Sequence, residues 1–173
     1  MANPLEELAS KAMGAAKLGK AALEGLTGVF RKLTQEHGEV AALLMRVRAT
    51  HDPKVRAELF PEIRRELLSH EKAELAVVYP AFRMHEEMRQ IADEHDIQSG
   101  QLEKMLGEIT PLAYDDPTWN TKFDALVDLV QRHVSIEEHD YFPKAEKVMD
   151  SNETEALRAQ YESVKEEAAS LLQ

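Results

Sequence analysis

Hydrophobic positions recur at helical spacing along most of this chain. Apolar residues fall three or four positions apart with charged residues between them, which is the pattern of an amphipathic helix with one buried face. In the first strong stripe, Leu33, His37 and Leu44 share one side of a helix. Such stripes predict five helices, over about residues 27–50, 53–80, 86–109, 117–142 and 152–172.

Proline residues and helix caps indicate where these helices start and bend. Asp52–Pro53 and Asp116–Pro117 each put a capping carboxylate before a proline at the first helical position, where a proline is tolerated. Pro61 either kinks the second helix or starts its main body, and Pro80 is expected to bend or end it.

Long amphipathic helices with short connections predict an all-α fold, an up-down-up-down antiparallel four-helix bundle. With 173 residues, the chain is long enough for one core and short for two independent domains. We expect an amphipathic N-terminal arm over residues 1–25, the bundle over residues 26–149, and a C-terminal helix over residues 150–173 that packs on the bundle. Asn152 and Glu155 suggest a capping box for this last helix, which carries no residues typical of a site.

The N-terminal arm is Ala-rich, amphipathic and only modestly hydrophobic, and three glycines weaken it as a helix. One interpretation is that it packs on its own domain or on the second subunit of a homodimer. The other is that it is a targeting peptide or docks on a partner protein.

Charge and composition narrow the range of partners. The formal net charge of −11 argues against nucleic acid or an anionic membrane as a partner. The absence of Cys excludes disulfides, thiolate zinc sites and Cys-ligated iron–sulfur clusters. No apolar run approaches the length of a membrane span, and no secretory signal is evident, so we expect a cytoplasmic protein.

Two segments of the chain repeat one arrangement, HEKAELAVVYP from residue 70 and HVSIEEHDYFP from residue 133. Each opens with a His, places a Glu four residues later and closes with an aromatic–Pro pair. On a helix, positions i and i+4 lie on one face, so each copy directs an imidazole and a carboxylate the same way. A Glu–His pair precedes each copy, at residues 36–37 and 94–95. A duplicated helical hairpin explains these matches.

Four inward His and two inward Glu are expected to meet at one level of the bundle core. The helix rise of about 1.5 Å per residue puts His95 and His133 at similar depths. The first hairpin fits with a short separate turn before Pro61. Burying this set would be costly without a charge partner, and no Lys or Arg shares these stripes at that level. A pair of bound cations resolves the cost, and the donors suit dinuclear iron or manganese better than magnesium or calcium. The expected metal ligands are His37, His70, Glu74, His95, His133 and Glu137, with the two glutamates bridging.

The remaining histidines are assigned outside the ligand set. His51 lies in a turn, His85 follows the bend at Pro80, and His139 lies about 200° around the helix from Glu137.

The other carboxylates near these histidines are expected outside the set of metal ligands. Glu71, Glu138 and Asp140 are expected in solvent, with Glu71 a candidate extra carboxylate because it adjoins an inner His. Glu36 and Glu94 are either outer hydrogen-bond acceptors for the ligands or surface charges.

The combined motif resembles the hemerythrin-like (HHE cation-binding) family over about residues 27–148. The resemblance rests on Glu36–His37, His70–Glu74 with Tyr79–Pro80, Glu94–His95, and His133–Glu137 with Phe142–Pro143. It implies a non-haem di-iron site in a four-helix bundle, with the six residues named above as ligands. The oxygen-carrying members have an extra His pair on the third helix and an Asp on the fourth, whereas this third helix offers only His95. The resemblance therefore favours sensing, scavenging or iron handling over reversible oxygen carriage.

The predicted function is a cytoplasmic protein with two carboxylate-bridged iron ions that binds or reduces a small oxidant (O2, H2O2 or NO). Its role would be sensing, detoxification or the response to oxidative stress, and whether it consumes peroxide or NO as an enzyme is left open. The alternative is an iron-storage or cargo module with little turnover that docks through residues 1–25. A ferritin-type ferroxidase is disfavoured because ExxH pairs are not in the right order, and a metal-free structural bundle is the remaining alternative.

Overall fold

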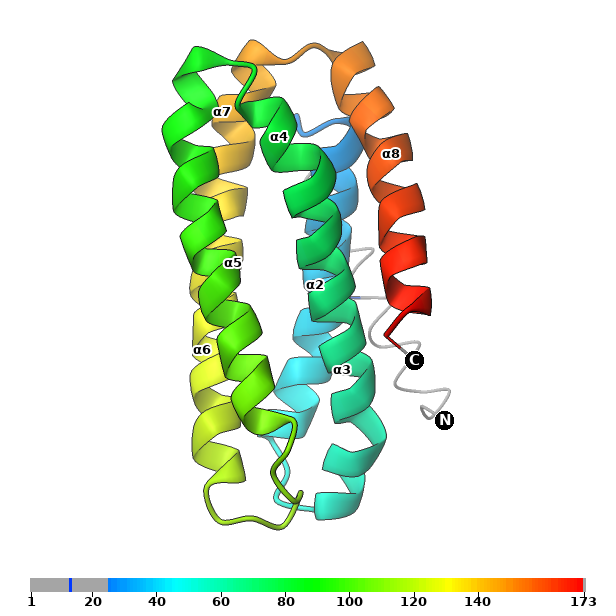
Figure 1. Cartoon of the computed structure of the whole chain (residues 1–173), viewed down its shortest axis with the longest axis vertical. Helices are drawn as coiled ribbons and strands as arrows, with labels where there is room; N and C mark the ends of the chain where they lie inside the picture. The colour runs from blue at the N-terminus through cyan, green and yellow to red at the C-terminus, as the bar shows by residue number, and fades with distance from the viewer. Residues whose placement is uncertain (1–12, 14–24, 173) are drawn as a thin grey trace.

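The computed structural model describes residues 13 and 25–172, and this part of the chain is helical without strands. Figure 1 shows the helices aligned with the long axis of the molecule. The expected arm over residues 1–25 lies almost entirely outside the described residues. The elements are α2 (Gly28–Arg48), α3 (Pro53–Ala73), the π-helical turn η1 (Glu74–Val78), α4 (Tyr79–Phe82), the 3-10 turn η2 (Glu86–Met88), α5 (Arg89–Ile109), α6 (Trp119–Ile136), the π-helical turn η3 (Glu137–Tyr141), α7 (Phe142–Val148) and α8 (Ser151–Ser170).

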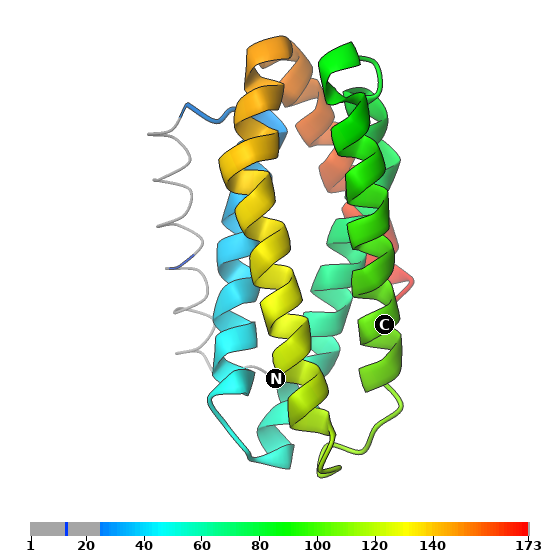
Figure 2. The same ribbon diagram turned by 90° about the vertical axis from the view of Figure 1, so that its left-hand side faces the viewer.

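The long helices pack side by side as a bundle, which confirms the all-α prediction. The turns after α2 and α5 lie at the lower end in Figure 1, and the connections after α4 and α7 lie at the upper end. Helix α5 packs on α6, α2 packs on α3 and α6, and α8 packs on both α2 and α3. Figure 2 shows the same arrangement after a quarter turn. None of the described helices is long and apolar enough to cross a membrane.

Aspartate side chains cap two of the helices. Asp52 accepts a hydrogen bond from the backbone two residues on at 2.9 Å, and Pro53 is the first residue of α3, as predicted. The matching prediction at Asp116–Pro117 is wrong, because α6 begins two residues after Pro117, at Trp119, and Asp116 accepts a hydrogen bond from the N–H of Thr118 ahead of the helix. The capping box predicted at Asn152 is wrong, because the carboxylate of Asp150 accepts the backbone N–H groups that open α8.

The two aromatic–Pro pairs follow π-helical turns. The N–H of Tyr79 bonds to the carbonyl of Glu74, and the N–H of Phe142 bonds to the carbonyl of Glu137, five residues back in both cases. A wider turn makes room for the proline ring, which in a regular helix would clash with the carbonyl four residues earlier. The helix therefore continues past Pro80 as α4 instead of ending there.

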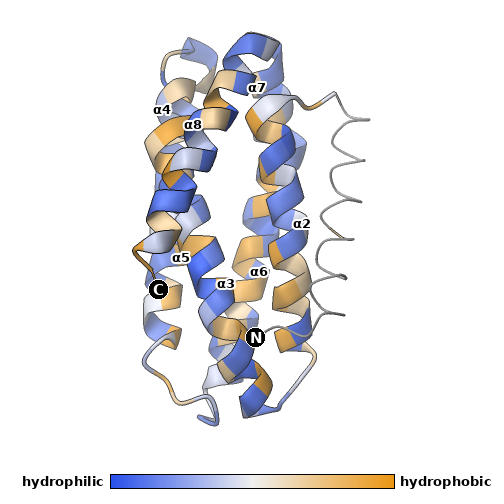
Figure 3. Cartoon of the chain, turned by 90° about the vertical axis from the view of Figure 1, so that its right-hand side faces the viewer, coloured by the Kyte–Doolittle hydropathy of each residue, from blue (hydrophilic) through white to orange (hydrophobic). Residues whose placement is uncertain are grey.

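Two apolar clusters divide the core into an upper and a lower part. The upper cluster joins the start of α2 to α4, α7 and α8, and includes Phe30, Tyr79 and Phe142. The lower cluster joins the end of α2 and the start of α3 to the end of α5 and the start of α6, and includes Phe60 and Trp119. Figure 3 shows that each helix carries both hydrophobic and hydrophilic residues. On every long helix, the predicted ligands fall between the segments that form the two clusters.

Candidate metal centre

The structure brings the six predicted ligands together in the middle of the bundle. Each is buried, and none is more than 8% exposed. Together with Glu71, they form two groups of side chains, and within each group the donor atoms lie within 4.8 Å of one another. The first group is His37, His70, Glu74 and Glu137, and the second is Glu71, Glu74, His95 and His133.

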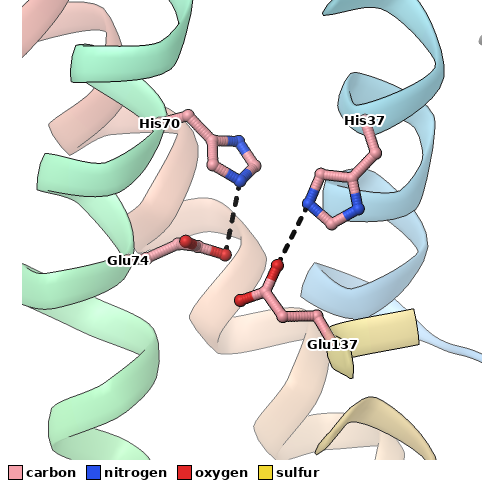
Figure 4. Close-up of side chains that lie close together, drawn as sticks. All are labelled: His37, His70, Glu74 and Glu137. Carbon is pink, nitrogen blue, oxygen red and sulfur yellow. Dashed lines mark ion pairs between the residues drawn. The ribbon is translucent and has the colours of Figure 1, made fainter. Parts of the chain in front are cut away.

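The first group joins three helices through two imidazole–carboxylate contacts. Nε2 of His37 on α2 lies 3.3 Å from Oε2 of Glu137, and Nε2 of His70 on α3 lies 3.4 Å from Oε1 of Glu74. Figure 4 shows the four side chains converging on one point from opposite sides of the core. Because each ring presents Nε2 to the centre, all of these donor atoms face the same small volume.

Glu74 belongs to both groups. Its second oxygen, Oε2, lies 3.3 Å from Nε2 of His95 on α5, on the other side from His70. Oxygens of Glu137 also lie 3.6 Å from His95 and 3.5 Å from Nε2 of His133. Glu74 thus directs one oxygen toward each histidine pair, the arrangement that a bridging carboxylate requires.

Glu71 is a member of the site, so its assignment to solvent is wrong. It is 6% exposed, and its Oε1 lies 3.2 Å from Nε2 of His133. The sequence signal was its position next to His70, which made it a candidate extra carboxylate. The Glu71 carboxylate meets His133 of α6 across the core, and periodicity along one helix does not show such a contact.

A second layer of hydrogen bonds fixes three of the imidazoles. Nδ1 of His37 lies 3.0 Å from Glu138, and Nδ1 of His70 lies 3.0 Å from Glu36. In the same way, Nδ1 of His133 lies 2.9 Å from the side-chain oxygen of Gln98. An acceptor at Nδ1 holds the proton there and leaves Nε2 free to ligate a metal.

The structure also shows where the other carboxylates near the histidines lie. Glu138 is buried against His37, so its expected place in solvent is wrong. Glu36 is an outer acceptor, whereas Glu94 is exposed and accepts a hydrogen bond from Tyr141 at 3.2 Å. Asp140 lies at the surface beside Lys144, as expected.

Two tyrosines reach the site from the upper cluster and from α8. The hydroxyl of Tyr79 donates to Oε1 of Glu137 at 2.5 Å, and its ring stacks on His95 with centroids 3.5 Å apart. The hydroxyl of Tyr161 donates to Glu36 at 2.6 Å, and Lys165 lies 2.8 Å from the same carboxylate. The expectation that the last helix has no residues relevant to a site is therefore wrong.

Three histidines excluded from the site lie apart from it. His51 pairs with Asn120 in the turn region, and His85 pairs with Glu153. His139 is exposed and bonds to the carbonyl of Ser135 on its own helix.

The carboxylates and imidazoles of the site perturb one another strongly. Burial lowers the pKa of His133, but the carboxylates of Glu137 and Glu71 outweigh this and raise it to about 10. Burial raises the pKa of Glu74, but His70 and His95 outweigh it and lower the pKa to about 2. Without a cation, the neighbours of His133 and Glu74 therefore favour the charged form of each.

The donor atoms at the centre are those that a metal would satisfy. Among the described residues, several buried side-chain atoms of the site form no hydrogen bond: Nε2 of His37, His70, His95 and His133, Oε2 of Glu71 and Glu137, and both oxygens of Glu74. Buried polar atoms are normally hydrogen-bonded, so such a convergent set needs another partner. Imidazole and carboxylate donors in a bundle core fit transition-metal ions.

Comparison with known families agrees with this chemistry. The family model of the hemerythrin HHE cation binding domain matches residues 22–145. The chain belongs to the hemerythrin family. No curated protein and no solved structure gave a significant match to the chain. Proteins of this family bind metal ions, typically iron, and the histidine and glutamate groups described above fit a metal site.

The two halves of this hemerythrin-family site differ in detail. Tyr79 places a hydroxyl on Glu137, whereas the matching aromatic residue of the second half, Phe142, has none. Glu71 follows the first His of one repeat, whereas Val134 follows the first His of the other. The second group of donors therefore includes Glu71, a carboxylate with no counterpart in the other repeat. In addition, α8 lies beyond the matched residues, so its contacts with the site are not part of the family match.

Proposed function

We propose that this hemerythrin-family protein holds two iron ions in an up-down-up-down four-helix bundle and binds or reduces a small oxidant. The observation that carries the proposal is the convergence of unpaired, buried donor atoms into two groups that share Glu74. Two imidazoles with two carboxylates at each position give a donor set suited to iron.

Each residue of the set has a defined part in the proposal. His37 and His70 would hold one ion, and His95, His133 and Glu71 the other. Glu74 and Glu137 would bridge the two ions, because oxygens of each glutamate lie beside histidines of both groups. Iron held by these residues would supply the redox chemistry with O2, H2O2 or NO.

The surrounding residues hold this set in place and limit water. The hydroxyl of Tyr79 fixes the orientation of Glu137, and the stacked ring of Tyr79 covers His95. The outer acceptors hold the Nδ1 protons, so the imidazoles keep Nε2 toward the centre. The apolar clusters above and below the site lower the local dielectric and limit hydration.

The proposed role is sensing, detoxification or the response to oxidative stress in the cytoplasm. Purified protein loaded with ferrous iron under anaerobic conditions tests it. On exposure to oxygen, peroxide or NO, we expect a near-ultraviolet absorption band of a bridged di-iron centre to appear or change. The matched variant Glu74→Ala should lose the band, and Glu103→Ala, at an exposed position on α5, should keep it.

One result would contradict the proposal, and another would favour the alternative function. Substoichiometric metal after loading, with no such band, would contradict it and leave a structural bundle. Stable iron that does not react with any of the three oxidants would instead favour a storage or cargo module, and loss of a protein partner on deleting residues 1–25 would support that module.

A further inference from the structure

A cavity of about 270 Å³ lies beside the candidate metal centre, among α2, α3, α5 and α6. Its inner end is lined by His70 of the first donor group and by Glu71 and His133 of the second. The Nε2 atoms of both histidines and Oε2 of Glu71 have no hydrogen-bond partner in the described part of the chain. A molecule in this cavity would therefore lie directly against the metal positions.

The cavity is much larger than a diatomic or peroxide ligand requires. A dry apolar cavity of about 150 Å³ in another protein accepts benzene, so about 270 Å³ has room for a molecule of ~10 non-hydrogen atoms. A ligand of the size of O2 or H2O2 would leave most of the volume empty. The cavity therefore has room for an organic molecule.

The walls indicate the chemistry of that occupant. Between its two ends, the cavity is lined by aliphatic side chains from four helices: Val40, Leu43, Leu67, Leu102, Val130 and Val134. Such walls offer no hydrogen bonds, so the body of a ligand must be apolar to avoid a desolvation cost.

The solvent side of the cavity disfavours anions. Glu39, Glu62 and Glu66 are half-buried there, and one cation, Lys165, also lines the cavity. Lys165 lies 2.8 Å from Glu36 and 3.1 Å from Glu66, so carboxylates already neutralise its charge. A carboxylate or phosphate ligand would meet net negative charge at this side.

We propose that this cavity binds an uncharged, largely apolar organic molecule of ~10 non-hydrogen atoms, with one end against the metal centre. The inference rests on the proposed function for the identity of the centre, but the binding itself needs only the cavity. The proposed ligands of the site then include an organic molecule as well as a small oxidant, and the two would bind next to each other.

Calorimetric titration with indole tests the cavity directly, because indole is uncharged and of the required size. The full-length protein is titrated in metal-free and iron-loaded forms, with iron content measured on each sample. We expect saturable binding of indole and at least tenfold weaker binding of its anionic counterpart, indole-3-carboxylate. In the iron-loaded form, bound indole should also shift the absorption spectrum of the centre.

Two variants link binding to this cavity. Leu102→Trp fills the cavity from α5 and should weaken indole binding at least tenfold, and Leu43→Phe from α2 is a second filling variant if the first does not fold. Ala41→Leu is the matched control, because Ala41 lines a neighbouring cavity between α2 and α6 and does not line this one. It should bind indole like the unaltered protein.

Two outcomes would overturn the inference. One is no binding of indole at millimolar concentration, and the other is equal binding by the folded filling variants. If the protein is fully loaded with iron, either result refutes the binding of an organic molecule in this cavity and leaves the proposed function intact. Indole binding by protein that takes up no iron refutes the proposed function and leaves the cavity as a ligand site.

Discussion

The hydroxyl oxygen of Tyr161 on α8 lies 2.8 Å from Nδ1 of His70 on α3. The same hydroxyl donates to Glu36, so an imidazole, a carboxylate and a phenol form one buried hydrogen-bonded group. Lys165, one turn further along α8, pairs with the same carboxylate. Helix α8 thus supports one ligand of the candidate metal centre from outside the residues that match the family model.

Replacing Tyr161 by Phe should weaken the metal position that contains His70. The variant removes the hydroxyl but keeps the ring, so packing changes little while Glu36 and His70 lose a partner. Loss of an outer hydrogen bond to a metal ligand typically lowers metal affinity about 10–100-fold. Competition with a chelator measures the affinity. Tyr114→Phe, in the loop beside Trp119, is the control and should leave it unchanged. Equal affinities for both variants would contradict the role of α8.

Replacing Glu71 by Gln tests the carboxylate that faces His133. Gln has nearly the same shape, but its amide cannot supply the negative charge of a carboxylate ligand. We expect iron content to fall from two ions per chain toward one, with the first donor group still occupied. Metal analysis and absorption spectra measure this. Glu103→Gln, an exposed position on α5, controls for the change in net charge. Full dinuclear loading of Glu71→Gln would contradict a role of the Glu71 carboxylate in metal binding.

The metal-free protein should lose stability as pH rises from 6.5 toward 10. Burial lowers the pKa of His133, but the neighbouring carboxylates outweigh burial and raise this pKa from 6.5 to about 10. The folded chain therefore keeps a proton that the unfolded chain loses. This contribution is fully present below pH 6.5 and is lost as the pH passes through about 10. On the acid side, the contribution of Glu74 is present above pH 4.5 and is lost as the pH falls through about 2.

Metal binding should reverse the alkaline trend. A metal replaces the proton at Nε2, so its affinity rises as pH rises and protons are released on binding. Chemical denaturation across this pH range, with and without iron, measures both curves. We expect the difference in unfolding free energy between them to grow with pH. A difference that stays constant would mean that the imidazoles do not exchange protons for metal.

Gly28 marks a close contact between the start of α2 and α8. Its φ of +45° disfavours a side chain, and an added Cβ would lie 2.3 Å from the backbone of Thr154. Gly28→Ala should destabilise the fold by about 1–3 kcal/mol, since backbone atoms must move. Gly107→Ala is the matched control, because Gly107 lies within α5 with open space at its Cβ. That change should stabilise by about 0.5–1 kcal/mol. Thermal or denaturant unfolding compares the two, and equal effects would contradict the contact.

The inner faces of the helices could be predicted because they depend on spacing within one segment. The i, i+4 relation places His70 with Glu74 and His133 with Glu137 on a shared face regardless of the partner helix. The surplus of residues in the first hairpin needs no separate turn before Pro61, because α3 is unbroken. Instead, the connection over residues 49–52 runs down the bundle axis before α3 begins, as Figure 1 shows.

The rest of the site could not be predicted because it depends on which helices become neighbours. Glu71 and Glu138 each sit one residue from an inner ligand, and only the packing of α2, α3 and α6 turns them inward. Gln98 has an ordinary helical sequence context. Tyr161 meets His70 across 91 residues of chain, a contact for which the sequence carries no local signal.

Mössbauer spectroscopy of the iron-loaded protein, with iron counted per chain, tests the central claim most directly. Two donor groups that share Glu74, one completed by Glu137 and the other by Glu71, predict two iron ions per chain. They should give two distinct quadrupole doublets of equal area from one magnetically coupled, diamagnetic pair in the oxidised state. A single uncoupled paramagnetic iron, or iron well below one per chain after loading, would contradict the di-iron account.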